Sequence, residues 1–331
     1  MAPPRPQTTP PTPPTPSIIR RAPVPPVAPI VLQLDRESLN HGFLQRLAGE
    51  SVWCDLPLTH DAAAADLHLQ PHPVRDAAWT PIYDGPGLLA GGVERIRSER
   101  GDQGGYRVTH QDGETFLVAA DGGTIRRHAA NAGAAGGVDD FAFTHITRAL
   151  GAPLALALAL RDIYLLHASG LAGNDGSVLA LTAESGGGKS TLAAAAAASP
   201  ELGLSRVADD QLPVRLGRAT AALPHFPQLK LSPEAQYPAG QAAVVGFRAL
   251  VELEVDAACA APALARESPP SAIQSLVRAT VAAKLFDREL LARHFNACAS
   301  AALTLPVYRL RTPQDLDRLA ETLAVLARIP A

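Results

Sequence analysis

The chain contains one segment whose residue types and spacing could hold the phosphates of a nucleotide. Residues 183–191 fit the phosphate-loop pattern G-x-x-x-x-G-K-[ST], with Ala183 in place of the first glycine. Consecutive glycines let backbone amides curl around phosphate oxygens, Lys189 would reach the β and γ phosphates, and the Ser190 hydroxyl would hold Mg²⁺. The residues predicted to bind ATP here are Ala183, Glu184, Ser185, Gly186, Gly187, Gly188, Lys189, Ser190 and Thr191.

The scarcity of lysine supports this interpretation of the loop. Among 29 lysines and arginines, only Lys189, Lys230 and Lys284 are lysines. A glycine-rich turn that only caps a helix does not require a lysine followed by two hydroxyls. Ala183 is compatible with the loop if its φ angle is an ordinary one, because glycine is needed only where φ is positive.

Two adjacent carboxylates could complete the chemistry of such a site. Asp209 and Asp210 come 20 and 21 residues after Lys189, at the end of the short apolar segment 204–208. Neighbouring carboxylates repel one another unless a cation or a proton separates their charges. One could therefore coordinate Mg²⁺ through water while the other takes a proton from an attacking hydroxyl. The alternative is a solvated turn.

His167 is a third candidate. It lies 22 residues before Lys189, at the end of the apolar segment 163–166. A hairpin would pair that segment with the strand that leads into the loop, so the imidazole could approach the phosphates. A histidine at a strand end is also often structural.

The elements that must position these residues can be read from the flanking sequence. Two apolar runs between residues 163 and 181 are separated by Gly-Asn-Asp-Gly at 173–176, which predicts a hairpin of antiparallel strands. The second strand, 178–182, leads into the loop, and an Ala-rich helix over 190–199 follows and ends before Pro200. The loop is therefore expected between a strand and a helix, as phosphate binding requires.

The rest of the chain reads as further α/β structure. Strands over 106–110, 115–119 and 124–127, separated by Asp-Gly turns, predict a meander. A buried helix is expected over 139–160. Towards the C-terminus we expect a strand over 249–255, helices between 270 and 302, a strand over 307–310, and a last helix that begins at Thr312-Pro313.

The domain organisation follows from changes in composition. Residues 1–30 hold 12 of the 30 prolines and are predicted to be a disordered tail, either a passive spacer or a docking peptide for a proline-binding partner. Residues 31–145 are predicted to form a small N-terminal β-rich α+β accessory region. Residues 146–331 would form the nucleotide-binding domain. With 331 residues, the chain is long enough for two domains.

Composition and charge exclude several classes of protein. With 47% hydrophobic and 18% charged residues, the chain is not collagen-like, coiled-coil or wholly disordered. A net charge of -3 argues against sequence-independent binding of nucleic acid. Its longest uncharged apolar run, 149–160, is too short for a membrane span. Three widely spaced cysteines suggest no disulfide framework, so we expect a soluble, cytoplasmic protein without membrane association.

Several segments together resemble a known family. Leu-His-Ala-Ser-Gly at 166–170, Gly-Lys-Ser-Thr at 188–191 and Val-Ala-Asp-Asp at 207–210 resemble the HPr serine kinase/phosphorylase-like kinases. Pro-Gln-Leu-Lys-Leu-Ser-Pro-Glu-Ala at 227–235 and Pro-Val-Tyr-Arg-Leu at 306–310 resemble segments of the smaller HPr-kinase-related proteins. The resemblance covers about residues 145–325. It implies an α/β P-loop fold of the HPr kinase/phosphoenolpyruvate carboxykinase type.

The resemblance also implies roles for individual residues. His167, Lys189 and Asp210 or Asp209 would be catalytic, and the Mg²⁺ ligands would come from Ser190, Asp209 and Glu234. Lys230 would bring positive charge to the phosphates, although Lys230 and Glu234 could equally form an exposed loop pair. Arg278 is a weaker candidate for the family's downstream arginine.

The expected function is ATP-dependent transfer of the γ-phosphoryl group to a serine or threonine hydroxyl. The bifunctional enzymes of the family carry an E-I-R-G-L-G type signature after the aspartate pair, and no such segment follows Asp210. We therefore expect a kinase without phosphorylase activity, acting on a peptide or small protein rather than HPr. A homo-oligomer is compatible with the sequence.

Two alternatives remain open. One is a nucleotide-binding regulatory protein of the same fold that does not transfer phosphate. The other is an ordinary P-loop ATPase, which predicts a parallel strand leading into the loop, whereas the turn at 173–176 predicts an antiparallel one.

A separate cluster of polar residues near the N-terminus matches no metal-ligand spacing and is expected to be a polar loop. It consists of His60, Asp61, Asp66, His68 and His72.

Overall fold

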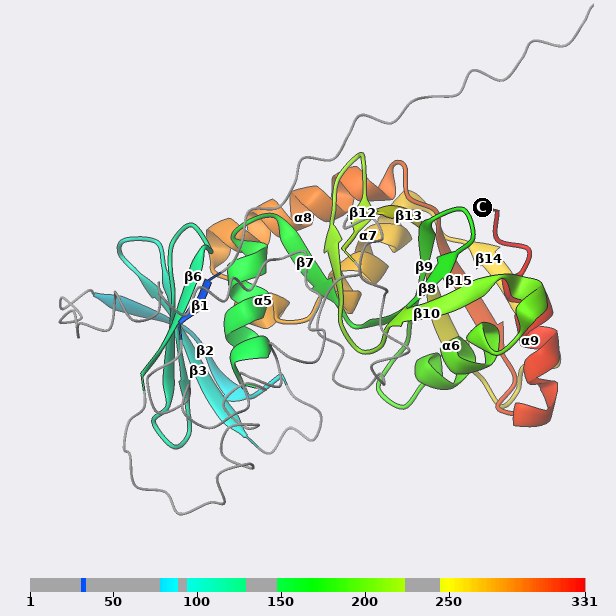
Figure 1. Ribbon diagram of the computed structural model, residues 1–331, viewed down its shortest axis with the longest axis horizontal. Coiled ribbons are helices and arrows are strands. Elements are labelled where there is room, and N and C mark those ends of the chain that lie inside the picture. The colour runs from blue at the N-terminus through cyan, green and yellow to red at the C-terminus, as the bar shows by residue number, and fades with distance from the viewer. Residues whose placement is uncertain (1–30, 34–77, 89–93, 129–147, 224–244, 331) are drawn as a thin grey trace, which may run out of the picture.

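A computed structural model of the chain describes residues 31–33, 78–88, 94–128, 148–223 and 245–330. These residues form a mixed α/β structure with two β-sheets (Figure 1). The predicted tail at 1–30, the polar cluster at 60–72, and Lys230 and Glu234 lie outside the described residues. In the described ranges, no helix is both long enough and apolar enough to cross a bilayer.

Sheet A has six strands in the order β1-β6-β5-β4-β3-β2. Its strands are β1 (Val31–Gln33), β2 (Trp79–Pro86), β3 (Arg95–Gly101), β4 (Tyr106–His110), β5 (Thr115–Val118) and β6 (Thr124–His128). Strands β2 to β6 pair antiparallel with their neighbours in chain order, and β1 joins β6 in parallel. These pairings confirm the predicted meander. Short turns allow each strand to pair with the next one in the chain.

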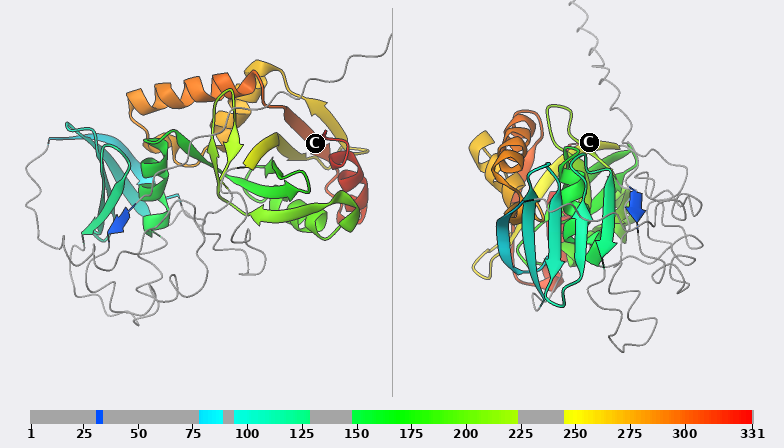
Figure 2. Two further views of the ribbon diagram at one scale, coloured as in Figure 1. Left: turned by 45° about the horizontal axis from the view of Figure 1, so that its top comes forward. Right: turned by 90° about the vertical axis from the view of Figure 1, so that its left-hand side faces the viewer.

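Sheet B carries the loop. Its strands are β7 (Ile163–Leu166), β8 (Ala168–Gly173), β9 (Ser177–Thr182), β10 (Leu204–Ala208), β11 (Leu212–Arg215), β12 (Ala221–Ala222), β13 (Val245–Val255), β14 (Ala263–Arg266) and β15 (Val307–Thr312). The order is β10-β8-β9-β13-β12-β11-β7, with β15 also beside β13 and β14 beside β15. Figure 2 shows the two sheets as separate bodies of strands, with β1–β6 on one side of the molecule.

Strand β9 has one antiparallel and one parallel neighbour. The predicted hairpin is confirmed for residues 168–182, since β8 and β9 pair antiparallel with Ala168 opposite Thr182. The expected pairing of segment 163–166 with the strand before the loop is wrong, because that segment forms β7, which pairs with β11. On its other side β9 pairs in parallel with β13, with Leu250 opposite Ala180. The antiparallel partner expected from the turn is present, and so is the parallel partner expected of an ordinary P-loop ATPase. Strand direction alone therefore does not distinguish the HPr-kinase-like interpretation from an ordinary P-loop ATPase.

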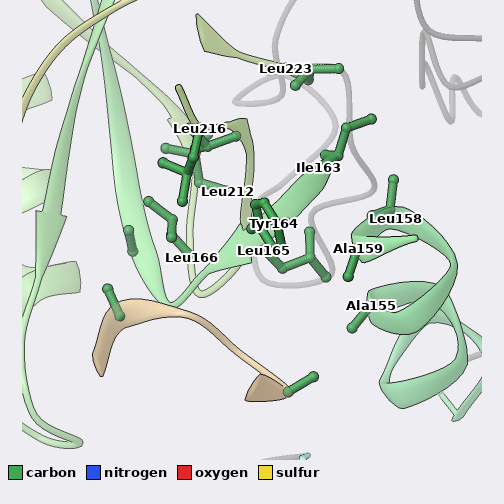
Figure 3. Close-up of a cluster of buried hydrophobic side chains, with 14 of the residues drawn as sticks. Ala155, Leu158, Ala159, Ile163, Tyr164, Leu165, Leu166, Leu212, Leu216 and Leu223 are labelled. Atoms are coloured by element: carbon green, nitrogen blue, oxygen red, sulfur yellow. The ribbon is translucent and has the colours of Figure 1, made fainter. Parts of the chain in front are cut away.

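Helix α5 (Ala152–Ala159) lies between the two sheets, and all eight of its residues are buried. Residues 148–150 are also helical, so the described end of the helix predicted over 139–160 is present, with an interruption at Gly151. Figure 3 shows side chains of α5, including Ala155 and Ala159, in one apolar cluster with Ile163 of β7. The apolar run is thus a buried connection rather than a surface helix.

Four further helices follow α5 in the described residues. They are α6 (Lys189–Ala197), α7 (Pro269–Ala279), α8 (Arg288–Ala302) and α9 (Leu319–Leu326), with 3₁₀ turns η1 (Pro200–Leu202), η3 (Ala283–Leu285) and η4 (Leu316–Arg318). Ser268 caps α7 and Asp287 caps α8 through side-chain oxygens that accept backbone N–H groups. Helices α6 and α9 share one apolar cluster, which includes Leu192 and Leu326.

The expected start of the last helix at Thr312-Pro313 is wrong. Thr312 is the final residue of β15, where it pairs with Val255 of β13. Its hydroxyl also shares a hydrogen bond of 2.6 Å with that of Thr322. Asp315 then caps the η4 turn, and α9 begins only at Leu319. Strand pairing therefore outweighs the helix-start signal of a threonine followed by proline.

Candidate active site

The loop at 183–188 joins β9 to α6, and its glycines occupy positions that other residues would strain. Gly186 and Gly188 have φ angles of +80° and +79°, in the left-handed region that glycine tolerates best. At Gly187 a Cβ atom would lie 2.9 Å from the Cβ of Ala183, too close for an added methyl group. Ala183 itself is not among the residues with positive φ, which satisfies the condition set by the missing first glycine.

Lys189 begins α6 and binds one of the two aspartates. Its Nζ atom donates a hydrogen bond of 3.1 Å to Oδ1 of Asp210. The lysine side chain is 10% exposed and the aspartate side chain 24%. Asp210 has a φ angle of +70°, a conformation that costs a non-glycine residue roughly 1–2 kcal/mol. Backbone strain of this kind often accompanies functional sites, because the surrounding structure must hold it in place.

Asp209 is the more buried member of the pair, with a side chain 4% exposed. Its Oδ1 atom accepts hydrogen bonds from the hydroxyls of Ser190 at 2.8 Å and Ser169 at 2.6 Å. Its Oδ2 atom pairs with the Arg206 guanidinium at 2.5 Å. The two aspartates therefore have different surroundings, since Asp209 is held by three side chains and Asp210 faces the loop lysine.

Sequence reasoning assigned no role to Ser169 or Arg206. Ser169 lies on β8 within the segment that carries the family resemblance, two residues after His167. Arg206 lies on β10, three residues before Asp209. The sequence does place these residues, a hydroxyl and a cation, on segments that are expected to be strands near the aspartates. The pairing of β10 with β8 brings them together, and this pairing could not be read from the local pattern.

His167 lies at the junction of β7 and β8, and its backbone is held from two sides. Its N–H donates to the carbonyl of Ala279 at 2.7 Å, and its own carbonyl accepts the Thr182 hydroxyl at 3.0 Å. Because Thr182 ends β9, the histidine is fixed beside the start of the loop. It lines a pocket of about 530 Å³ together with loop residues 183–185.

Arg278, the weaker candidate for the family's downstream arginine, also lines this pocket. Its Nη2 atom donates to both carboxylate oxygens of Glu252, at 2.8 and 2.9 Å. The Ser275 hydroxyl donates to the same carboxylate at 2.6 Å. Lys284 and residues 87–88, which follow β2 of sheet A, complete the pocket. The structure thus brings His167 and Arg278 to one pocket, and Lys189 to the aspartates.

The oxygens at the start of α6 are suited to Mg²⁺. This ion prefers oxygen ligands, keeps several waters, and usually takes only one or two protein groups besides substrate phosphates. The Ser190 hydroxyl and an Asp209 carboxylate oxygen lie 2.8 Å apart and could both face one ion. No group of three or more histidine, cysteine or acidic side chains able to hold a metal occurs among the described residues. A site shared with nucleotide phosphates does not need one.

Comparison with known proteins gives little beyond this geometry. No family model matches the chain, and no curated protein matches it. Among solved structures, the chain is similar to the HPr(Ser) kinase/phosphatase from Coxiella burnetii, with 15% sequence identity and a TM-score of 0.28. That match covers 50% of this chain and 95% of the other. The family resemblance of the motifs therefore stays a prediction.

Proposed function

We propose that this protein is an ATP-dependent kinase of the HPr-kinase-like type that transfers the γ-phosphoryl group to a serine or threonine hydroxyl. One observation carries the proposal. The two residues that open α6, Lys189 and Ser190, bind Asp210 and Asp209 respectively, so a loop built for phosphate meets two carboxylates. Phosphoryl transfer requires a cation for the phosphates, a ligand set for Mg²⁺, and a group that orients or deprotonates the attacking hydroxyl.

In this mechanism Lys189 moves from a carboxylate to a phosphate. The ammonium group now binds Asp210, and bound β and γ phosphates would compete for it. Asp210 Oδ1 would then accept the proton of the attacking hydroxyl. The acceptor oxygen forms its bond to the γ phosphorus as the bond between that phosphorus and the β–γ bridging oxygen breaks, and ADP leaves.

Asp209 and its partners have a separate task. Ser169 and Arg206 hold the Asp209 carboxylate, whose Oδ1 atom also accepts the Ser190 hydroxyl. Mg²⁺ bound there would neutralise charge that develops on the transferring phosphate. His167, fixed beside the loop, would contribute a further donor near the acceptor. The proposed acceptor is a peptide or small protein in the cytoplasm, and no signature for the reverse reaction follows Asp210.

The test is to separate binding from transfer with Asp209→Asn and Asp210→Asn. Both changes keep side-chain volume and remove one charge. We expect each variant to bind Mg²⁺–ATP in calorimetric titration. Transfer from γ-labelled ATP to acceptors in a cell extract should fall at least 100-fold for Asp210→Asn, the usual range for loss of a general base. Wild-type transfer rates in both variants would refute the proposal, as would ATP binding by the wild-type protein without any transfer.

A further inference from the structure

We propose that the 530 Å³ pocket beside the loop is the site for the phosphoryl acceptor, and that this acceptor is an extended peptide segment carrying the hydroxyl. The inference rests on the proposed kinase function. The pocket adjoins the loop, because it is lined by loop residues 183–185 but not by Lys189 or Ser190. A pocket of this volume falls in the range that holds a ligand of several amino-acid residues.

The charges of the lining favour a neutral main chain over a second phosphate-bearing molecule. Among the described residues that line it, two are acids, Glu184 and Glu252, and two are bases, Arg278 and Lys284, besides the imidazole of His167. Glu252 is bound by Arg278 and Ser275, so its charge is already compensated. Without a net positive charge, the pocket offers little attraction for a triphosphate. It suits uncharged, hydrogen-bonding peptide groups better.

The shape of the lining leads to the same conclusion. Much of the wall consists of alanines and a glycine, namely Ala183, Ala279, Ala282, Ala283 and Gly87. Such small side chains leave space beside the loop, and an extended peptide is recognised in part by pockets that take its alternate side chains. Among the described lining residues there is no phenylalanine, tyrosine or tryptophan, and the one ring is that of His167. Without a larger aromatic surface for adenine, the pocket is better suited to an acceptor.

Residues 279–283 of the lining, called the acceptor wall below, are held together with His167. The His167 N–H donates to Ala279 at 2.7 Å, and the Val281 N–H donates to Leu165 at 2.8 Å, so residues 279–281 pair with the end of β7. The Thr280 hydroxyl contacts the Leu276 carbonyl and Nε2 of the buried His294, each at 2.9 Å. An acceptor on this wall would thus be placed at a fixed position relative to the imidazole and the loop.

Sheet A closes the pocket on the other side. Lys284 donates a hydrogen bond of 3.0 Å to the carbonyl of Pro86 at the end of β2, and its ammonium lies 4.8 Å from the centre of the Tyr83 ring. Residues 87 and 88 continue from that point into the pocket lining. This arrangement gives the N-terminal sheet a function in acceptor recognition, which neither the loop nor the aspartates require for nucleotide binding.

The test fills the pocket without touching the nucleotide residues. Ala283→Trp adds an indole to the acceptor wall, and Ala320→Trp makes the same change at an exposed position on α9 as a control. The probe is a degenerate peptide library with serine or threonine at its centre, offered with γ-labelled Mg²⁺–ATP. We expect kcat/KM for the library to fall at least tenfold in Ala283→Trp only, with the Kd for Mg²⁺–ATP within twofold of wild type in both variants.

A second variant covers the case in which the tryptophan prevents folding. Lys284→Met keeps the aliphatic stem and removes the ammonium that binds Pro86. We expect a higher KM for the peptides, an unchanged Kd for Mg²⁺–ATP, and a kcat changed less than KM.

The contrary outcomes distinguish the two proposals. Unchanged peptide transfer in Ala283→Trp and Lys284→Met overturns the acceptor site, and an equal loss of ATP binding shows that the pocket holds the nucleotide instead. If wild-type protein binds ATP and phosphorylates extract proteins but no library peptide, the peptide class is wrong while the kinase function stands. If wild-type protein does not bind ATP, the kinase function itself fails.

Discussion

Two regions of this molecule bury pairs of opposite charges, and only one of them has the features of an active site. Next to sheet A, Arg148 binds Glu94, Asp112 and Glu114, and Glu114 also binds Arg127. At the loop of sheet B, Lys189 binds Asp210, and Arg206 binds Asp209. Each cluster has a carboxylate whose side chain is only 4% exposed, Glu114 beside sheet A and Asp209 at the loop.

The backbone makes the difference between the two clusters. The charged residues beside sheet A all have ordinary φ angles, whereas Asp210 and the loop glycines Gly186 and Gly188 do not. The space above Gly186 is open, since a methyl group added to its α-carbon would meet no atom within 4 Å. The cluster beside sheet A is a closed cross-link between strands and a helix. The loop cluster leaves room for a further anion, and that room is what suggests phosphate chemistry.

The largest expected effect is that of Lys189→Ala on ATP binding. The variant removes the cation at the start of α6, and Lys284, the other lysine of the described residues, is bound to the Pro86 carbonyl in the neighbouring pocket. We expect calorimetric titration with Mg²⁺ and ATP to show at least a 100-fold weaker Kd. Arg266→Ala, which removes an exposed cation on β14, is the control and should bind as wild type. An unchanged Kd in Lys189→Ala would contradict the nucleotide site.

Next comes the stability of the cluster beside sheet A. Arg148→Met keeps apolar volume but leaves Glu114, whose side chain is 4% exposed, with one cation fewer. Because Arg127 still binds Glu114, we expect a loss near the lower end of the about 3–5 kcal/mol that follows when a buried charge is left without any partner. Denaturant unfolding should show this loss, with Arg266→Met as control. The Kd for Mg²⁺–ATP should not change where the variant is folded, and a change would show that the two clusters are coupled.

The third effect compares a buried histidine in each region. Burial lowers the pKa of His294 to about 4, and burial lowers that of His110, which nearby Glu94 partly opposes. Both are neutral when folded, so the unfolded chain binds more protons and stability is lost as the pH falls below about 6.5, for His294 down to about 4. For His294 the loss approaches about 3 kcal/mol. Across this range, the pH dependence of the free energy of unfolding should decrease more in His294→Gln than in His110→Gln.

The smallest effect is expected from single glycines. Gly186→Ala and Gly113→Ala each place a methyl group on a residue with positive φ, +80° in the loop and +89° in sheet A. Each should lower the free energy of unfolding by about 1 kcal/mol. Only Gly186→Ala should also weaken ATP binding, because its backbone belongs to the loop. Equal ATP binding in the two variants would mean that the geometry of the loop at residue 186 does not matter.

The parts of the structure that could be predicted from sequence are those set by neighbouring residues. The turn at 173–176, the strand and helix on either side of the loop, and the meander of β4 to β6 follow from local patterns. The close approach of Lys189 to Asp210 is in keeping with the motif that singled them out. In each case the turn, glycine or charge that determines the structure lies within or next to the segment concerned.

The rest depends on contacts between distant segments. The role of Ser169 follows from its hydrogen bond to Asp209, 40 residues away, which needs β10 to pair with β8. The parallel pairing of β9 with β13 joins residues such as Ala180 and Leu250. The pocket needs β2, β7, α7 and η3 together. No local periodicity encodes such registers, because they are selected by packing of the whole core.

The position of β9 between β8 and β13 also has a consequence for how the protein is made. The hairpin partner precedes β9, but the parallel partner begins at Val245, more than 60 residues after Thr182. During synthesis the chain therefore emerges with the loop at 183–188 attached to a strand that has an open edge. Such non-local pairing is slow, and an unpaired edge invites association between chains. A nascent chain that ends before residue 245 should accordingly expose β9 to chaperones, and the loop should become rigid only after β13 has left the ribosome.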